Sequence, residues 1–280
     1  MIKVGLIDDY LDNWHANNYP KLISECSGGR YSAACACGRA DSPYGGMTNR
    51  KWSEKTGIPL RERPEDVINE CDVLMVLAPN SPETHPEIAD AALRSGKLVY
   101  VDKTFAADGK TAREMLALAD AHGTPCWSSS ALRFSSELNG VDRGKIFRVY
   151  SEGTGAYEKY SIHQIEPVVT LMGARAEKLM FTGDPEHPSM IISFADGRCA
   201  DIVQRLDPAY SFRITTVDKE DNAKFYDIRS DYFRLFVDAV IRFFDTGKVP
   251  VAHEETIDVV AVREAGKRGM ERPFEWIDIG

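Results

Sequence analysis

Two polar residues of the sequence follow apolar runs, at places where a side chain can act on a ligand. Asn80 comes just after the continuous apolar run 72–78, and Lys103 comes just after the shorter run 98–101. Because ligands of an open α/β sheet bind at the carboxyl ends of its strands, both side chains are expected at a binding edge. An ammonium group there orients a ligand oxygen and stabilises negative charge that develops on it. Asn80 and Lys103 are therefore candidate site residues.

A second group of candidate residues surrounds His163. Apolar residues recur at helical spacing after it, and a proline is tolerated in the first turn of a helix, so Pro167 predicts a helix over 164–172. His163 would then lie beside the helix N-terminus, which disfavours a cationic imidazole and helps it act as a base. Tyr160 could donate a proton, and Lys159 could bind an anionic group of a substrate. The alternative is that His163 is a structural residue of the core.

The first part of the chain has the pattern of a parallel sheet covered by helices. Apolar runs predict strands at 2–7, 31–37, 72–78, 98–101 and from 125 onward. The segments between them predict helices at 13–25, 47–56, 64–70, 83–95 and 108–122. This alternation with continuous apolar strands is typical of a doubly wound, Rossmann-type α/β sheet.

The pattern changes near residue 130, where strands follow one another with few helices between them. Strands are predicted at 145–152, 177–183, 189–195, 198–206 and 211–217, with Asp196-Gly197 as a hairpin turn. Helices are predicted at 230–246 and 254–268. We therefore expect an α+β region with a mostly antiparallel, open-faced sheet and helices on one side. The expected domains are a Rossmann-type nucleotide-binding domain, 1–126, and a substrate and oligomerisation domain, 127–280.

The composition argues against several classes of function. The chain has 280 residues and a formal net charge of -9, which argues against nucleic-acid binding because that needs a basic surface. No run approaches the roughly 18 apolar residues of a membrane helix, and the N-terminus lacks the pattern of a signal peptide. The six cysteines include no C-x-x-C pair. We interpret them as reduced core thiols of a cytoplasmic protein without a metal site.

Several motifs resemble the Gfo/Idh/MocA family of oxidoreductases. The stretch 71–85 is similar to the family's strand followed by P-N-x-x-x-H, and 91–104 is similar to its A-A-L-x-x-G-K-x-V-x-x-E-K-P. The segment 131–134 is similar to its R-F motif, and 155–173, which contains His163, resembles its helix bearing G-x-H-x-x-D. Since 235–267 resembles the family's closing helices, the resemblance covers most of the chain.

The resemblance implies an NAD(P)-dependent oxidoreductase that acts on the hydroxyl of a sugar, polyol or related small hydroxy compound. It implies that Lys103 lies near the nicotinamide and the substrate hydroxyl, and that His163 is the acid/base, with Tyr160 as a further catalytic candidate. It also implies a homodimer or homotetramer in which the open sheet face is covered. The implied cofactor-binding residues are Asp8, Tyr10, Leu11, Arg39, Ala78, Pro79, Asn80, His85 and Asp102, and the implied substrate-binding residues are Lys159 and Arg133.

The loop after the first strand departs from the family pattern. Where the family carries G-x-G-x-x-G, this chain reads Asp-Asp-Tyr-Leu-Asp-Asn over 8–13. A glycine at the second place lets the backbone approach a diphosphate, and Tyr10 would fill that space. Asp8 would add negative charge: two unit charges about 4 Å apart repel by about 4 kcal/mol at an effective dielectric of 20. After the second strand, Gly38-Arg39 suits a 2′-phosphate, so NADP is preferred to NAD, unless Arg39 is an ordinary loop residue.

Two further departures lie closer to the expected chemistry. Thr104 replaces the proline of E-K-P, so the sequence does not favour the cis peptide that a proline would. Lys159 stands where the family has an acidic partner of the histidine, so it cannot act as a carboxylate partner. Three functions therefore stay open: an NAD(P)-dependent oxidoreductase, a cofactor-free relative that binds a ligand or partner chain, and a non-redox lyase or hydrolase on the same fold.

Overall fold

The chain folds into two compact units, which a computed structural model describes over residues 1–280. The first unit contains residues 1–129 and 236–253, and the second contains 130–235 and 254–280. The predicted domains, 1–126 and 127–280, differ from these units mainly in residues 236–253, which group with the first unit. None of the helices has the length and apolar content needed to cross a membrane.

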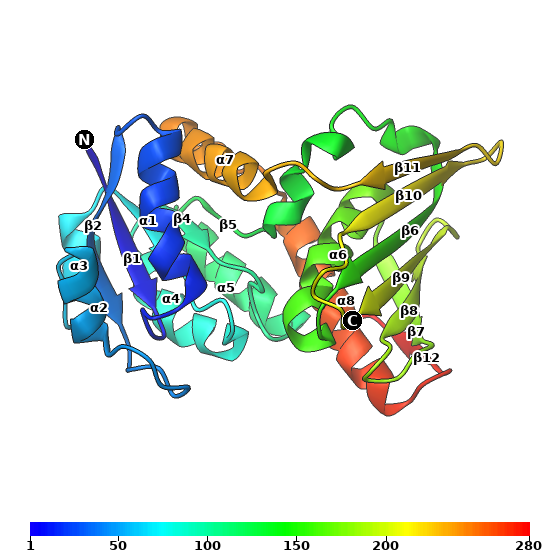
Figure 1. Cartoon of the computed structure of the whole chain (residues 1–280), viewed down its shortest axis with the longest axis horizontal. Helices are drawn as coiled ribbons and strands as arrows, with labels where there is room; N and C mark the ends of the chain where they lie inside the picture. The colour runs from blue at the N-terminus through cyan, green and yellow to red at the C-terminus, as the bar shows by residue number, and fades with distance from the viewer. The chain divides into compact units, whose positions relative to one another are not determined.

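The first unit is built on a five-stranded parallel sheet of strand order β2-β1-β3-β4-β5 (Figure 1). This confirms the predicted doubly wound sheet. The order reverses between β1 and β3, and ligands of such sheets bind in the crevice at this point, outside the carboxyl ends of the strands. The strands are β1 (Ile2–Asp8), β2 (Tyr31–Gly38), β3 (Val73–Val76), β4 (Leu98–Val101) and β5 (Cys126–Trp127).

The helices of the first unit begin at polar caps that the sequence supplies. The side chain of Asn13 accepts a hydrogen bond from the backbone N–H of Ala16 at 3.0 Å, and Thr48 and Asp108 cap two further helices in the same way. Residues 236–246 of α7 bring Phe236 against Tyr100 of the sheet, with ring centroids 5.3 Å apart. The helices are α1 (Trp14–Cys26), α2 (Asn49–Thr56), α3 (Pro64–Glu70), η1 (Pro82–Thr84), α4 (His85–Leu93), α5 (Gly109–Ala121) and α7 (Tyr232–Thr246).

The second unit is built on a seven-stranded sheet of order β11-β10-β6-β9-β8-β7-β12. All its strand pairs are antiparallel except β6 with β9, which confirms the expected mostly antiparallel sheet. Asp196-Gly197 forms the predicted turn between β8 and β9, and Gly197 has the positive φ of 82° that such turns require. The strands are β6 (Ile146–Thr154), β7 (Ala176–Phe181), β8 (Ser189–Phe194), β9 (Cys199–Arg205), β10 (Arg213–Asp218), β11 (Ala223–Asp227) and β12 (Trp276–Asp278).

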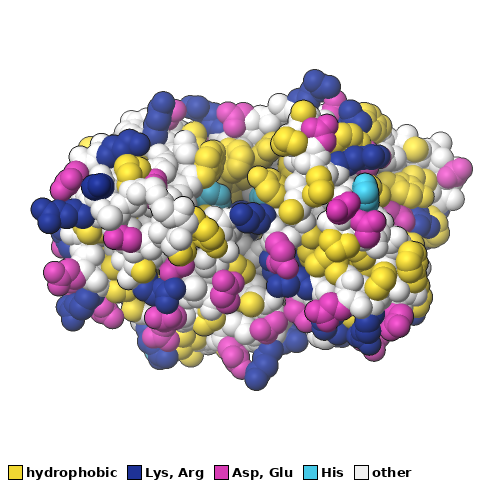
Figure 2. All heavy atoms as spheres, turned by 60° about the horizontal axis from the view of Figure 1, so that its bottom comes forward, with side chains coloured by type: hydrophobic (Ala, Val, Ile, Leu, Met, Phe, Trp, Pro, Cys, Tyr) yellow, Lys and Arg dark blue, Asp and Glu magenta, His cyan; other side chains and the backbone are white.

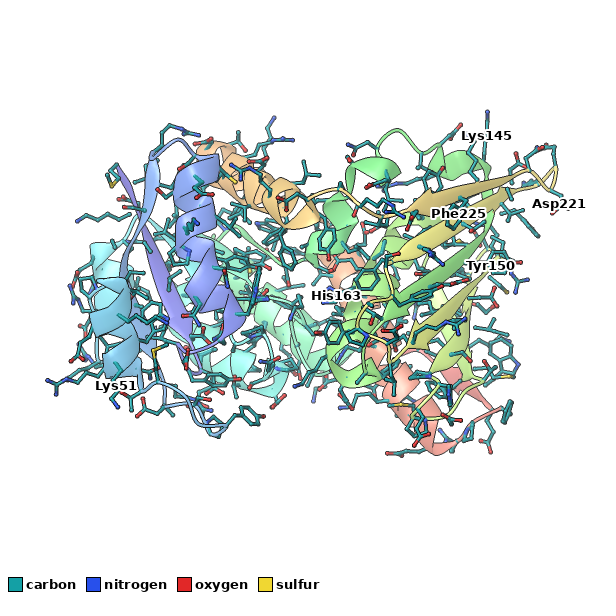
Figure 3. All side chains as sticks on the ribbon, viewed as in Figure 1. Lys51, Lys145, Tyr150, His163, Asp221 and Phe225 are labelled. Atoms are coloured by element: carbon teal, nitrogen blue, oxygen red, sulfur yellow. The ribbon has the colours of Figure 1, made fainter.

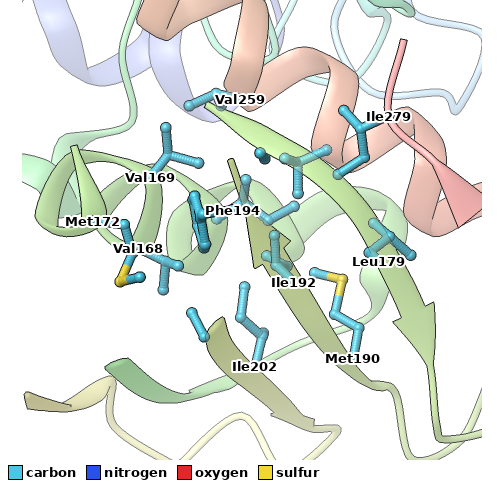
Figure 4. Close-up of a cluster of buried hydrophobic side chains, with 14 of the residues drawn as sticks. Val168, Val169, Met172, Leu179, Met190, Ile192, Phe194, Ile202, Val259 and Ile279 are labelled. Atoms are coloured by element: carbon cyan, nitrogen blue, oxygen red, sulfur yellow. The ribbon is translucent and has the colours of Figure 1, made fainter. Parts of the chain in front are cut away.

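Helices α6 (Tyr157–Met172) and α8 (His253–Glu271) supply the apolar side chains that pack on one face of this sheet. Figure 4 shows this core, where Val168 and Val169 of α6 meet Phe194 and Ile202 of the strands. The prediction for α6 is wrong in extent, because the helix begins at Tyr157 and includes Pro167 in its interior. Short 3-10 helices η2 (Ala131–Phe134), η3 (Ser136–Leu138) and η4 (Arg143–Lys145) precede β6.

The other face of the second unit's sheet is open. Large apolar side chains lie on it in place of the usual polar ones: Tyr150 is 42% exposed, Trp276 46% and Phe225 63%. Figure 3 shows Tyr150 on the side of the sheet opposite to His163 of α6. Over the visible surface in Figure 2, acidic and basic side chains are interspersed.

Candidate functional site

Asp8 ends β1 and closes the loop that follows it. Its carboxyl group is buried and accepts hydrogen bonds from three donors: the backbone N–H of Asp9 at 2.8 Å, the backbone N–H of Ala78 at 2.9 Å, and the amide of Asn13 at 2.8 Å. Burial raises the pKa of Asp8 to about 7, although the hydrogen bonds from Asn13, Ala78 and Asp9 lower it. The carboxyl group therefore ties the ends of β1 and β3 together.

Asn49, the first residue of α2, reaches into the same loop. Its Oδ1 accepts a hydrogen bond from the backbone N–H of Leu11 at 2.9 Å, and its amide donates to the carbonyl of Ala40 at 2.7 Å. Gly38 leaves the space for this side chain, since a Cβ there would lie 2.5 Å from Nδ2 of Asn49. The backbone N–H groups of Asp9 and Leu11 in this loop thus donate to the side chains of Asp8 and Asn49.

These contacts decide whether a diphosphate fits the loop. A diphosphate at a helix N-terminus is held by backbone N–H groups that no side chain covers. Here the N–H groups of Asp9 and Leu11 already have acceptors, and Tyr10 is buried with its hydroxyl accepting from the Asn80 amide at 3.2 Å. The loop in this conformation does not fit a diphosphate, as the sequence predicts for Asp8 and Tyr10.

The groups at the ends of β3 and β4 fit a ligand better. Nζ of Lys103, which follows β4, donates to the carbonyl of Pro79 at 3.1 Å. Pro79 and Asn80 both follow β3. The structure thus brings the predicted residues Lys103, Pro79 and Asn80 to one edge. The peptide bond between Lys103 and Thr104 is cis. The doubt that the sequence raised about a cis bond here is therefore removed, although Thr104 does not favour that form as a proline would.

Asp102 makes a contact that the sequence did not reveal. Its buried carboxylate accepts from Nδ1 of His15, from the hydroxyl of Tyr100 at 3.0 Å and from the backbone N–H of Lys103 at 2.8 Å. Burial would raise the pKa of Asp102, but the charge and hydrogen bond of His15 and the charge of Lys103 outweigh it and hold the pKa at about 2. His15, which no motif of the sequence singled out, thus lies against a buried carboxylate at this edge.

Arg39 is exposed but paired with two carboxylates, and His85 is buried. The guanidinium of Arg39 donates to Asp9 at 2.8 Å and to Glu87 at 3.3 Å, beside a cavity of about 220 Å³. A 2′-phosphate would have to compete with both carboxylates. The ring of His85 is fully buried, and its nitrogens contact the carbonyls of Phe105 at 2.9 Å and Leu77 at 2.6 Å. This arrangement favours a structural role for His85.

In the second unit, His163 lies in the middle of α6. Its Nδ1 is 2.7 Å from the hydroxyl oxygen of Ser130, and the backbone N–H of Ser130 donates to Glu166 at 2.6 Å. The expected position at a helix N-terminus is wrong, since the helix continues for six residues before His163. The ring of Tyr160 meets that of His163 edge to face, with centroids 5.8 Å apart. Ser130 and Glu166, which sequence reasoning did not single out, therefore help to set the orientation of the imidazole.

Arg133 takes part in a buried ionic cluster of the second unit. Its Nη1 lies 2.6 Å from Glu255 and 3.6 Å from Glu166, and its side chain is only 10% exposed. Burial opposes ionisation of Glu255, but Arg133 and the hydroxyl of Thr170 lower its pKa. A charge paired in this way is poorly placed to bind a substrate. Lys159, by contrast, is exposed on α6.

The two units define a class of fold, in which one unit has a parallel, Rossmann-type sheet and the other a mostly antiparallel sheet. The chain superposes on myo-inositol 2-dehydrogenase from Lactobacillus plantarum with a TM-score of 0.79 at 14% identity, covering 100% of this chain and 99% of that one. For scyllo-inositol dehydrogenase from Lactobacillus casei the TM-score is 0.78 at 14% identity, with 100% and 98% covered. For the WlbA dehydrogenase from Bordetella pertussis, in complex with NADH and UDP-GlcNAcA, it is 0.74 at 15% identity, with 100% and 99% covered.

A comparison with protein-family models finds a match over part of the chain. Residues 45–130 match the model of the Gfo/Idh/MocA oxidoreductase family, described as having an NAD-binding Rossmann fold. The resemblance indicated by the sequence is therefore confirmed: the chain has the fold of Gfo/Idh/MocA-type dehydrogenases and carries the family's pattern over this stretch. No curated protein matches the chain by sequence.

Proposed function

We propose that the chain is an NAD(P)-dependent oxidoreductase that acts on the hydroxyl of a sugar, polyol or related small hydroxy compound. The observation that supports this most is the group at the ends of β3 and β4. There the ammonium of Lys103 is held 3.1 Å from the carbonyl of Pro79, beside Asn80. A cation fixed at the carboxyl edge of an open α/β sheet is suited to a ligand oxygen on which negative charge develops.

The proposed chemistry divides between residues that orient and residues that move a proton. Lys103 would exchange its bond to the Pro79 carbonyl for one to the substrate oxygen. In the second unit, His163 would serve as an acid/base through Nε2, because Nδ1 is directed at Ser130. Tyr160 is the further candidate proton donor, and the exposed Lys159 would bind an anionic group of the substrate. A nicotinamide dinucleotide, NADP or NAD, supplies a hydride acceptor when bound.

The closed β1–α1 loop favours a second candidate function. With Asp8 and Asn49 as built-in acceptors, the loop offers a diphosphate no uncovered donors from Asp9 or Leu11. A cofactor-free relative that binds a small hydroxy compound, or transforms it without redox chemistry, would have no need of those donors. The two candidates differ in a single measurable property, the affinity for dinucleotides.

Dinucleotide titration separates the candidates. The melting temperature is followed with NAD, NADH, NADP and NADPH, since a ligand at 100 times its Kd adds about 2.7 kcal/mol to the free energy of unfolding. A shift with one of them supports the oxidoreductase, and no shift at millimolar concentration removes it. Turnover is then screened with a panel that includes myo-inositol and scyllo-inositol. Lys103→Ala should abolish turnover while retaining dinucleotide binding, and the exposed Lys110→Ala serves as the matched control.

The open face of the second sheet supports a proposal on assembly. Tyr150, Phe225 and Trp276 expose large apolar surfaces there, and such surfaces on a sheet are commonly covered by a partner. We therefore propose a homodimer or homotetramer in which this face is buried.

A further inference from the structure

His15 and Asp102 stand out among the buried titratable groups of the first unit. His15 lies in the first turn of α1, which follows β1, and Asp102 follows β4. Both positions are at the carboxyl edge of the sheet, where ligands of such folds bind. Lys103 also contacts this pair, because its backbone N–H donates a hydrogen bond to the carboxylate of Asp102 at 2.8 Å.

We propose that His15 and Asp102 form an acid–base dyad at this edge, an alternative to His163, in which Nε2 of His15 exchanges a proton with a ligand hydroxyl. The nature of the ligand, a small hydroxy compound, rests on the proposed function. The step itself is a proton transfer: the ligand O–H bond breaks, the proton moves to Nε2, and the imidazolium is stabilised by Asp102. The negative charge left on the ligand oxygen is of the kind that the Lys103 ammonium stabilises.

The geometry of Asp102 supports this assignment. The carboxylate is fully buried, and its oxygens are engaged by Nδ1 of His15, the Tyr100 hydroxyl and the Lys103 N–H. A carboxylate held by three donors is fixed in orientation and fixes the imidazole in turn, with Nδ1 inward. A base oriented by a third group is the arrangement that recurs in acid–base catalysis. No residue of the chain hydrogen bonds to Nε2, which is then the atom left for a ligand.

The surroundings of His15 differ from those of a structural histidine. The rings of Trp14 and Tyr19 pack against the imidazole, with centroids 5.4 Å and 4.9 Å away, and leave the residue 8% exposed. The charged groups on this side are Asp102, Lys103 and Asp8, and the charge of Asp102 adds to the burial that raises the pKa of Asp8. His85, in contrast, has no exposed surface and directs both nitrogens at backbone carbonyls. His85 therefore provides an internal comparison.

Chemical modification tests the dyad without a known substrate. Diethyl pyrocarbonate modifies neutral imidazole nitrogens that are accessible, and peptide mass spectrometry gives the rate at each histidine of the full chain. We expect His15 to react at a rate within tenfold of the exposed His122, and His85 to stay unmodified. Asp102→Asn should change the rate at His15, because the imidazole loses the carboxylate that orients it, and should leave the rate at His122 unchanged. A His15 as unreactive as His85, or a rate at His15 that Asp102→Asn leaves unchanged, would overturn the proposal.

A kinetic comparison is made if the panel yields a substrate. His15→Asn and His15→Gln should lower kcat by about 10²–10⁴-fold with KM little changed, the range for general acid–base groups, and His122→Asn should leave both unchanged. Two variants are used so that misfolding of one, checked by near-ultraviolet circular dichroism, does not decide the result. Full turnover by either folded variant would refute the dyad. If the oxidoreductase proposal fails, the wild type shows no turnover with any member of the panel. The modification rates of the histidines then decide whether the dyad proposal holds.

Discussion

Replacing Asp8 by Asn should increase the affinity of the chain for dinucleotides. The buried carboxylate lies in the loop that meets a diphosphate in related folds. For an assumed separation of about 4 Å, two unit charges repel by about 4 kcal/mol at an effective dielectric of 20, which corresponds to about a thousandfold in the Kd of the form with ionised Asp8. Asparagine has the same shape, and its Oδ1 can still accept from the N–H groups of Asp9 and Ala78. The substitution removes the charge together with the hydrogen bond from the Asn13 amide.

The pH dependence gives this prediction a sign that can be checked. The pKa of Asp8 is raised to about 7 by burial, so the wild-type carboxyl is largely neutral at pH 6 and ionised at pH 8. The wild-type Kd for NADP or NAD should therefore rise between pH 7 and 9, by up to about tenfold per pH unit. The Kd of Asp8→Asn should vary much less over this range. Isothermal titration calorimetry at four pH values measures both proteins.

Two controls accompany the experiment. Asp72→Asn removes one charge near the start of the sheet, where the carboxylate accepts from the N–H of Lys3 at 2.8 Å, and should leave the Kd unchanged. The free energy of unfolding reports on folding: because the folded pKa of Asp8 lies above 3.8, the contribution of Asp8 to wild-type stability is fully present below pH 3.8 and is lost as the pH rises through 7. Asp8→Asn should lack that loss. Equal and pH-independent affinities for wild type and Asp8→Asn would refute the reasoning about the loop.

Two other substitutions test the charged dyad and the open face. Asp102→Asn should lower the free energy of unfolding by about 2 kcal/mol near neutral pH, because a pKa of about 2 against 3.8 stabilises the fold above pH 3.8 and is lost as the pH falls towards 2. Urea unfolding from pH 3 to 8 measures this difference, and a constant difference would contradict it. Tyr150→Asp places a charge on the apolar open face and should shift the oligomer towards monomer in light scattering, whereas Lys51→Asp on α2 should not. A wild-type monomer would remove the proposed assembly.

Much of the fold could be predicted because many of its strands and turns follow from short stretches of sequence. Continuous apolar runs identified β3 and β4, and Asp196-Gly197 identified the turn between β8 and β9. The short strands β11 and β12 were missed, since β11 has no buried residue and the three residues of β12 are too few to show an alternation. The start of α6 was misplaced because Pro167 was taken to mark a first turn. A proline inside a helix removes one hydrogen bond, to the carbonyl of His163, and the many buried residues of α6 offset that cost.

The site was predictable only where it follows from strand ends. Lys103 and Asn80 lie at the edge where the sequence placed them, because a strand end determines both. The contacts of His15 with Asp102 and of Asn49 with Leu11 join residues 87 and 38 positions apart, and no spacing rule connects such pairs. The sequence indicated that the β1–α1 loop is unfavourable for binding a phosphate. Only the folded chain shows that the side chains of Asp8 and Asn49 accept the hydrogen bonds of the Asp9 and Leu11 N–H groups, which a phosphate would otherwise accept.

A substitution of Asn49 tests whether the chain binds a dinucleotide through the β1–α1 loop or functions without one. Asn49→Ala removes the acceptor of the Leu11 N–H, and a buried donor left without a partner costs about 1–3 kcal/mol. A phosphate oxygen bound there would restore the hydrogen bond. If the chain binds a dinucleotide through this loop, the melting temperature of Asn49→Ala should be lower than that of the wild type, and the shift on adding the dinucleotide should be larger. If the chain functions without a dinucleotide, Asn49→Ala should lose stability and gain no response to it. A dinucleotide-dependent shift that is the same in both proteins would mean that the diphosphate binds away from Leu11.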